Sequence, residues 1–491
     1  MNPSARFAKF AFFPLSMLLS SCVVGPNYSK VKVNAPAAFR GAEGTAQQAS
    51  IADLPWWDIF QDDTLKSLIQ TSLANNYDLA AVVTRVEQAR QVDAEARSQY
   101  FPAINYNPAV SGGKNQFTAS PSSNGNGLQG FFLGLAIATW EPDVWGRIRR
   151  MNESARAQYL ATEEGRRGVM LTLVSDVSQA YFELLELKLQ LDIARVTAES
   201  YGQSLKLFSQ RLDAGIVSKL ATARASAAEA TAAANLPELD RLIALKENQI
   251  SILLGKNPEP IEVKAKLLDE TVPPQVPSGL PSALLERRPD VLAAEQNVRA
   301  ANAQIGVATA AYFPTIGLTT FLGKVSSPLS DITSGRTNAW SIGANLAGPI
   351  YEGGALKAKK RQAIAAWEEA RNQYLQTSLS AFRDVSDALV SREKYDLIRV
   401  EQARAVQSGR ESVRLSMMRF LEGLSSYYEV LEAQQELFPS QMALAQTELN
   451  RRLVIVQLYK ALGGGWNLTN AEWIAGKAVA GAQGPAASKT P

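Results

Sequence analysis

The chain has 491 residues, a formal net charge of +3, one Cys and no His. Lack of His removes the commonest metal ligand and the usual general base, and one Cys forms neither an internal disulfide nor a cysteine-rich metal site. Balanced charge argues against a nucleic-acid-binding face, and no motif joins a nucleophile to a base. We therefore expect no enzyme activity, no cofactor, no metal and no nucleic-acid partner.

The first 21 residues are typical of a lipoprotein signal peptide. Arg6 and Lys9 precede an apolar stretch at 10–19 that is too short for a permanent membrane helix. The sequence LSSC then resembles a bacterial lipobox, so we expect Cys22 to become an acylated N-terminus carrying palmitate. The alternative is an ordinary signal peptide with a chance cysteine. Val23, rather than Asp, follows the cysteine, which indicates sorting to the outer membrane.

Two phrases of the sequence occur twice. QYFPAINYN (99–107) returns as AYFPTIGLT (311–319), and RLDAGIVS (211–218) returns as RFLEGLSS (419–426) at an offset of 208. This pattern predicts a two-fold internal repeat. The expected divisions are a signal peptide (1–21), a lipidated segment (22–63), a first repeat (64–255), a Pro-rich linker (256–281), a second repeat (282–466) and a disordered tail (467–491).

Each repeat is expected to begin with a helix and two strands. Helices are predicted at 64–99 and 289–311, ended by Pro102 and Pro314. Alternation of bulky apolar residues with small or polar ones then predicts four strands, at 103–112, 129–140, 315–324 and 338–348. Two such faces fit a soluble sandwich, or a membrane barrel with lipid on the apolar face and a lumen on the other.

A long helical hairpin completes each repeat. Residues 147–213 lack Pro and carry apolar residues at alternating spacings of three and four, which is a heptad pattern. The counterpart at 355–421 is less regular. Gly215 and Gly423 mark the predicted tips, and helices return along 218–254 and 425–462, kinked or interrupted at Pro237 and Pro439.

Four strands cannot close a barrel, and an open edge in lipid would leave backbone groups without partners. Two chains would give eight strands, whose interior side chains fill, whereas three would give twelve strands around a lumen. If the strands span a membrane, the sequence therefore predicts a homotrimer of a mixed α and β membrane protein.

Four segments resemble the outer membrane factor family, the TolC-like efflux outlets, and in particular its lipoprotein branch associated with multidrug efflux. They are CVVGPNY (22–28), PWWDIFQDDTLKSLIQTSLANNYDL (55–79), WEPDVWGRIR (140–149) and ERRPDVLAAEQNVRAANAQIGVATAAYFPTI (286–316). The resemblance implies a trimeric twelve-stranded outer-membrane β-barrel, four strands per chain, continued by an α-helical coiled-coil tunnel in the periplasm. It further implies a lipid-anchored, passive outlet for small toxic compounds, docked to a periplasmic adaptor (membrane fusion) protein and an inner-membrane RND-type pump.

The same resemblance implies functional positions near the tips. Glu429 and Glu432 lie one helical turn apart, where the family carries an acidic ring that constricts the closed end. The alternative is a solvated helix face. Arg419 and Phe420, just before the turn, either hold the tip shut or simply pack. Any acidic ring comes from the second repeat only, because Ala221 occupies the place equivalent to Glu429.

The two tips are also where the family meets its adaptor, which points to Gly215, Ser218, Gly423 and Ser426 as docking residues; the alternative is a plain loop. Two other functions fit a long helical hairpin. One is the outlet of a type I polypeptide secretion system. The other is a structural envelope-spanning coiled coil, against which the alternating strands argue because a stalk needs no barrel.

Overall fold

The computed structural model describes residues 23–42, 50–114, 129–269, 279–326 and 338–477. Most of these residues are helical, and four strands form one antiparallel sheet in the order β1-β2-β3-β4. Within the described ranges, none of the helices combines the length and the apolar character that crossing a membrane requires. Cys22 lies outside the described residues, so its acylation stays a prediction.

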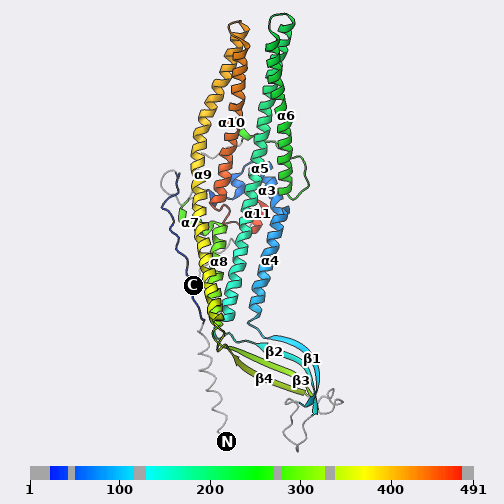
Figure 1. Cartoon of the computed structure of the whole chain (residues 1–491), viewed down its shortest axis with the longest axis vertical. Helices are drawn as coiled ribbons and strands as arrows, with labels where there is room; N and C mark the ends of the chain where they lie inside the picture. Colours follow the sequence, from blue (N-terminus) through cyan, green and yellow to red (C-terminus); the bar gives the residue numbers. More distant parts are fainter. Residues whose placement is uncertain (1–22, 43–49, 115–128, 270–278, 327–337, 478–491) are drawn as a thin grey trace, which may run out of the picture. The chain divides into compact units, whose positions relative to one another are not determined.

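Two series of elements follow the same order along the chain (Figure 1). The first series is α4 (Tyr77–Ser98), β1 (Ala103–Lys114), β2 (Gln129–Trp140), α5 (Arg147–Asp213) and α6 (Lys219–Leu253). The second series is α8 (Pro289–Ala310), β3 (Thr315–Ser326), β4 (Asn338–Ala347), α9 (Ala355–Leu421) and α10 (Tyr427–Ala461). Matching helices have equal lengths: 22 residues in α4 and α8, 67 in α5 and α9, and 35 in α6 and α10.

The sheet joins the two series through its central pair of strands. In the β2–β3 ladder, Phe131 lies opposite Ser326 and Trp140 lies opposite Leu318. The β1–β2 ladder shifts register between Tyr106 and Ala109. Pro108 lies at that shift, and proline has no N–H to donate to a ladder. Among the described strands, β1 and β4 each have one neighbour, so both are edges.

The edge strands expose large apolar side chains at alternate positions. Ile104 and Tyr106 lie on one face of β1, with 75% and 87% of their surface exposed. Trp340, Ile342 and Leu346 are likewise exposed along one face of β4. A surface of this kind needs an apolar environment or a partner.

Contacts divide the chain into two compact units, and each unit draws on both series. One unit contains the sheet with the adjoining parts of α4, α5, α8 and α9; the other contains the hairpin ends and α3, α6, α7, α10 and α11. The division expected from the sequence follows the two repeats instead. Sequence similarity identifies segments with the same order of elements, whereas the compact units are defined by which residues pack together.

The unit that contains the hairpin ends has a core of large apolar side chains. It is built from α2 (Trp56–Ile59), α3 (Asp63–Asn75), α5, α10 and α11 (Asn470–Ala475). Trp56, Tyr181, Tyr459 and Trp473 are its largest members, and all four are buried. On α5, Val177 of the predicted heptad pattern and Tyr181, which is outside that pattern, lie one helical turn apart on the same buried face.

The predicted single helix at 64–99 is wrong: the structure has α3 and α4 with Asn76 between them. The backbone of Asn76 is extended, and its side-chain amide donates to the backbone oxygen of Leu253 at 3.0 Å. Its side-chain oxygen accepts from the backbone N–H of Leu79 at 2.9 Å. Asn76 therefore ends one helix and caps the next. Local sequence patterns could not predict this, because its partner Leu253 is 177 residues away in the chain.

The predicted disordered tail at 467–491 is wrong for its first part. Thr469 and Glu472 form a capping box at the start of α11, and Trp473 is buried in the core. Arg166 donates to the side-chain oxygen of Asn470, which ties α11 to α5. One buried tryptophan and a cap are enough to order a short segment of otherwise low hydrophobicity. Residues 478–491 lie outside the described part of the chain.

Pro237 and Pro439 interrupt neither returning helix, since each lies inside a continuous α6 or α10. The predicted linker at 256–281 packs against the helices through Ile261 and Leu267. It also includes a short 3-10 helix, η4 (Leu267–Asp269), and it ends at Pro281, where α7 (Pro281–Arg287) begins. Three of its prolines fall in 270–278, outside the described residues.

Candidate functional site at the hairpin tips

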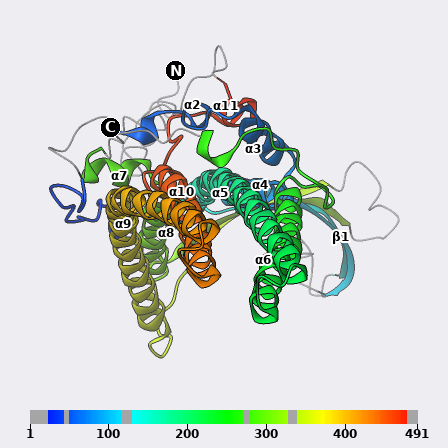
Figure 2. The ribbon, with the colours of Figure 1, turned by 90° about the horizontal axis from the view of Figure 1, so that it is seen from above.

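Each long hairpin turns at a glycine in the left-handed region. Figures 1 and 2 show α6 beside α5 and α10 beside α9. Gly215 and Gly423 have φ of 72° and 74°, and no atom lies within 4 Å of a Cβ added at either glycine. The residue after each glycine donates its N–H back into the helix: Ile216 to Arg211 and Leu424 to Arg419, both at 2.8 Å. Glycine is thus required by backbone conformation and not by lack of space.

The two tips differ in how the returning helix is capped. The hydroxyl of Ser218 accepts from the backbone N–H of Ala221 at 3.4 Å, whereas Ser426 makes no such side-chain bond. Both serines are exposed, as are Gly215 and Gly423. The four predicted docking residues therefore lie on accessible turns, and docking itself stays a prediction.

An aromatic cluster joins the two hairpins just behind the tips. The Phe208 ring of α5 lies 4.0 Å from the Tyr427 ring of α10 and 5.4 Å from the Phe420 ring of α9, centroid to centroid. The Arg211 guanidinium lies over Phe420, 4.9 Å from its centroid. Burial raises the pKa of the Tyr427 phenol. Phe420 is 8% exposed, so the structure places it in the packing between hairpins.

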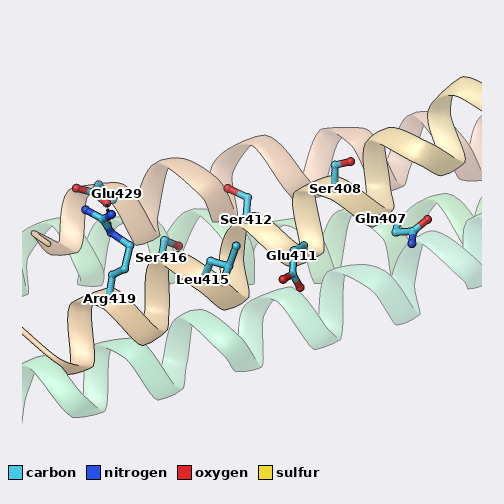
Figure 3. A pocket seen from close by; sticks show the side chains of 8 residues that line it. All are labelled: Gln407, Ser408, Glu411, Ser412, Leu415, Ser416, Arg419 and Glu429. Atoms are coloured by element: carbon cyan, nitrogen blue, oxygen red, sulfur yellow. Dashed lines mark ion pairs between the residues drawn. The ribbon is translucent and has the colours of Figure 1, made fainter. Parts of the chain in front are cut away.

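Arg419 and Glu429 form an ion pair across the α9–α10 turn, with 3.5 Å between nitrogen and oxygen (Figure 3). Both side chains are about half exposed, and such pairs contribute roughly 0–1 kcal/mol to stability. Glu432 is also exposed, one turn further along α10. The structure therefore brings together two of the four predicted gate residues, places Phe420 behind them, and leaves Glu432 outside this pair.

A groove of about 700 Å³ runs along α9 behind this ion pair. Its lining residues, apart from Leu415, are of polar or charged types: Gln407, Ser408, Glu411, Ser412, Leu415, Ser416, Arg419 and Glu429. A hydrogen bond from Arg414 holds the pKa of the exposed Glu411 carboxyl below its usual value. Glu411 is thus a second anionic group on this surface, which the sequence did not single out because its relation to Glu429 depends on how α9 packs beside α10.

The groove offers charged groups and hydrogen-bonding groups. Within the described part of the chain, no three His, Cys, Asp or Glu side chains are arranged to hold a metal ion. Arginine, glutamate, serine and glutamine side chains on an exposed surface suit electrostatic steering of solutes or contact with a polar partner surface.

Comparisons with known proteins point in one direction. The family described as "Outer membrane efflux protein" matches residues 68–256 and 280–464. The chain is 32% identical over 464 residues to the "Probable efflux pump outer membrane protein TtgC" of Pseudomonas putida, covering 92% of this chain and 94% of that one. It is 33% identical over 467 residues to "Outer membrane protein OprJ" of Pseudomonas aeruginosa, covering 92% and 95%.

Solved structures of outer-membrane channels are also similar to this chain. The outer-membrane channel OprN superposes with a TM-score of 0.83 at 30% identity, over 91% of this chain and all of that one. The open state of the Neisseria gonorrhoeae MtrE outer membrane channel gives a TM-score of 0.80 at 27% identity, over 91% and 99%. Similarity thus extends along nearly the whole length of both partners.

Proposed function

Because the chain belongs to the family of outer membrane efflux proteins, we propose that it is the outer-membrane channel of a tripartite efflux pump. In this role it is a passive outlet for drugs or other small toxic compounds. The observation that carries the proposal is the full-length match to relatives named as efflux pump components, one of them for toluene and one for antibiotics. The same names favour efflux over polypeptide secretion and over a purely structural stalk.

The working channel in this proposal is a homotrimer. Edge strands β1 and β4 lack second neighbours among the described strands and expose apolar side chains, which supports pairing with further copies. Three copies give a closed twelve-stranded barrel around a lumen, continued by a tunnel of six helical hairpins. The equal helix lengths of the two series support a two-fold internal repeat, so that every hairpin follows one plan.

The partners in this proposal are a periplasmic adaptor and an inner-membrane RND-type pump. The tips Gly215 to Ser218 and Gly423 to Ser426 are exposed turns, which suits tip-to-tip contact with an adaptor. Acylation of Cys22 adds a lipid anchor in the outer membrane, where the barrel already lies.

We place the gate at the α9–α10 tip, with Glu429 and Glu432 as an acidic ring in the assembled tunnel. The ion pair with Arg419 refines this proposal, because it neutralises part of the charge of Glu429. Six carboxylates in a narrow bore would attract cations and repel anions, and Arg419 would moderate that field.

Reversal potentials of the reconstituted protein under a salt gradient test both parts. The double variant Glu429→Gln with Glu432→Gln should lower the preference for cations, whereas Arg419→Gln should raise it by freeing Glu429. Glu229→Gln, on α6, is the matched control and should leave the potential unchanged. Gln keeps size and helix propensity, so the fold should persist. An unchanged potential in the double variant would return both glutamates to the solvated outer face.

A further inference from the structure

The start of α9 carries four basic side chains within its first seven residues: Lys357, Lys359, Lys360 and Arg361. We call these four residues the basic collar. Three of them are exposed and Lys360 is partly buried. No carboxylate among the described residues forms an ion pair or a hydrogen bond with any of the four. The collar is therefore a concentrated positive charge that the chain itself does not neutralise.

These cations lie at the unfavourable end of a helix. The N-terminus of a helix carries a partial positive charge from its free N–H groups, which favours acidic side chains and disfavours basic ones. The first turn of α9 contains no acidic residue. An external anion would relieve both the repulsion among the four cations and their repulsion from the helix dipole.

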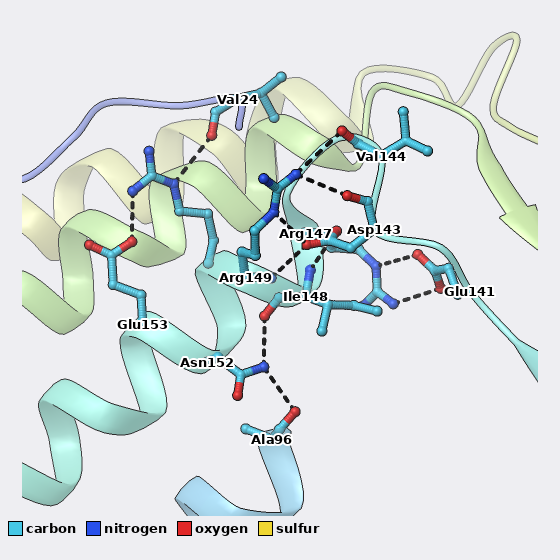
Figure 4. A network of polar contacts seen from close by, with 11 residues as sticks. Val24, Ala96, Glu141, Asp143, Val144, Arg147, Ile148, Arg149, Asn152 and Glu153 are labelled. Atoms are coloured by element: carbon cyan, nitrogen blue, oxygen red, sulfur yellow. Dashed lines mark hydrogen bonds and ion pairs between the residues drawn. The ribbon is translucent and has the colours of Figure 1, made fainter. Parts of the chain in front are cut away.

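The start of α5 is the equivalent place in the first series, and there acidic side chains of the same chain pair with the basic ones (Figure 4). There Arg147 pairs with Glu141 at 2.7 Å and Arg150 pairs with Glu153 at 2.6 Å. Asp143 accepts from the guanidinium of Arg149 at 3.1 Å. All three cations of this junction are thus neutralised within the chain.

An offset of 208 aligns α5 with α9 and shows what has changed. The three acids of the first junction, Glu141, Asp143 and Glu153, correspond to Pro349, Tyr351 and Arg361. One acid has become a cation and the other two have become apolar or aromatic. The second junction therefore lacks an internal neutralising set at the positions where its counterpart has one.

Exposed apolar side chains lie directly beside the collar. Ile350 is fully exposed and Tyr351 is 88% exposed, and both precede α9 by a few residues. Leu346 continues the apolar surface onto the end of β4 that precedes α9. Aromatic side chains next to lysines and arginines are typical of the level where hydrocarbon meets lipid headgroups. From Lys357 to Arg361 the helix rises by about 6 Å, comparable to one headgroup layer.

We propose that the basic collar binds the phosphate groups of anionic phospholipids at the periplasmic ends of the strands. The inference rests on the proposed function, in which β1 to β4 span the outer membrane. The occupant is a lipid rather than a second copy, because the acids Glu141, Asp143 and Glu153 of the equivalent junction in every copy are already paired. Tyr351 and Ile350 would then lie against the upper acyl chains of the same lipids.

The test uses the full-length protein reconstituted in mixed phosphatidylethanolamine and phosphatidylglycerol bilayers. Brominated phosphatidylglycerol quenches tryptophan fluorescence, and Trp140, which is exposed at the junction end of β2 opposite Leu318, is the reporter. The wild type should bind brominated phosphatidylglycerol in preference to brominated phosphatidylethanolamine. The triple variant Lys357→Gln, Lys359→Gln and Arg361→Gln should lose several-fold of that preference, since each cation near an anionic surface contributes about fivefold in binding. Salt should weaken the wild-type preference and not that of the variant.

Two control variants make the result specific. Removing three exposed cations from the unit of the hairpin ends, with Lys206→Gln, Lys219→Gln and Arg410→Gln, should leave the lipid preference intact. The charge-keeping pair Lys357→Arg with Lys359→Arg should keep it too, and this pair remains informative if the neutral variant assembles poorly.

Each outcome is decisive. An unchanged preference in the neutral variant overturns the inference. So does dissociation of the trimer with lipid preference intact, which would show that the collar meets another copy. A wild-type protein that neither inserts nor conducts overturns the proposed function and this inference together, whereas a conducting wild type without lipid preference overturns the inference alone.

Discussion

The helices α5 and α9 are each 67 residues long, yet the chain covers them very differently. α5 contributes a long series of buried apolar side chains, and among its large apolar residues Val196 is the exposed one. α9 leaves seven large apolar residues about half exposed, namely Leu379, Leu397, Ile398, Val400, Leu415, Met418 and Leu421. One plan thus yields a helix that completes the core of its own chain and a helix whose apolar surface its own chain leaves uncovered.

The difference is concentrated in a few aligned positions. Leu184, Leu187 and Leu191 on α5 correspond to Arg392, Tyr395 and Arg399 on α9. Arg399 pairs with Glu448 of α10 at 2.6 Å, whereas Leu191 packs near Leu239 of α6. Duplicated sequences can therefore keep helix length and tip geometry while exchanging apolar packing for ion pairs.

The largest expected effect comes from a cavity in α5. Leu184 is fully buried against Ile250 and Ile261, so Leu184→Ala should lower the free energy of unfolding by about 2–5 kcal/mol. Thermal unfolding followed by circular dichroism measures this loss. Leu397→Ala, on the exposed face of α9, should change the unfolding of one chain by no more than about 0.5 kcal/mol but reduce the trimer fraction in crosslinking. Equal effects of the two variants would remove the contrast between the helices.

A buried acid on α5 adds a pH dependence of stability to the comparison of α5 with α9. Burial raises the pKa of the Glu186 carboxyl to about 7, and the residue is 4% exposed. The aligned position on α9 is the exposed Lys394, paired with Glu393. An acid whose pKa is higher when folded binds its proton more tightly in the folded state. The contribution of Glu186 to the free energy of unfolding is therefore complete at pH values below its unfolded-state pKa. It is lost as the pH rises to about 7, and the loss is at most about 3 kcal/mol.

Glu186→Gln should therefore flatten the decline in melting temperature between mildly acidic and neutral pH. Glu199→Gln is the matched control, because Glu199 is exposed on the same helix and accepts from Gln203 just as Glu186 accepts from Gln190. A decline that survives in Glu186→Gln, or vanishes in Glu199→Gln, would contradict this assignment.

The smallest expected effect concerns the two junctions. Asp143 accepts from the backbone N–H groups of Ile148 at 3.0 Å and Arg149 at 2.8 Å, so it caps α5. Asp143→Ala should cost about 1–2 kcal/mol of stability. Tyr351→Ala, at the aligned position before α9, should cost little because the ring is exposed. Melting temperatures in detergent would measure both, and a larger loss for Tyr351→Ala would show that the second junction has internal support.

The sequence predicts the long elements well because their signals are local. Freedom from Pro and a turn-forming Gly at 215 or 423 define α5 and α9, whose observed bounds coincide with the predicted 147–213 and 355–421. Alternation marks the strands in the same way, and the structure has them at 103–114, 129–140, 315–326 and 338–347. The family, and with it the efflux function, follows from motifs that are contiguous in the chain.

What local patterns miss is set by distant partners. Asn76 breaks a helix because the backbone oxygen of Leu253 accepts its amide, and α11 forms because Trp473 reaches the core. At the candidate site, the pairing of Arg419 with Glu429 depends on the packing of α10 beside α9. Phe208 belongs to the predicted heptad pattern, but its ring contacts with Tyr427 and Phe420 depend on how the two hairpins pack together.

The β2–β3 ladder also constrains the order in which the protein can be made. Trp140 pairs with Leu318 and Phe131 with Ser326, so the centre of the sheet waits until the whole of the first series, α8 and β3 have been synthesised and exported. Until then the β1–β2 hairpin carries an unpaired apolar edge in water, where non-local pairing is slow and aggregation competes. The nascent chain should therefore depend on periplasmic chaperones that shield this hairpin until its late partner arrives.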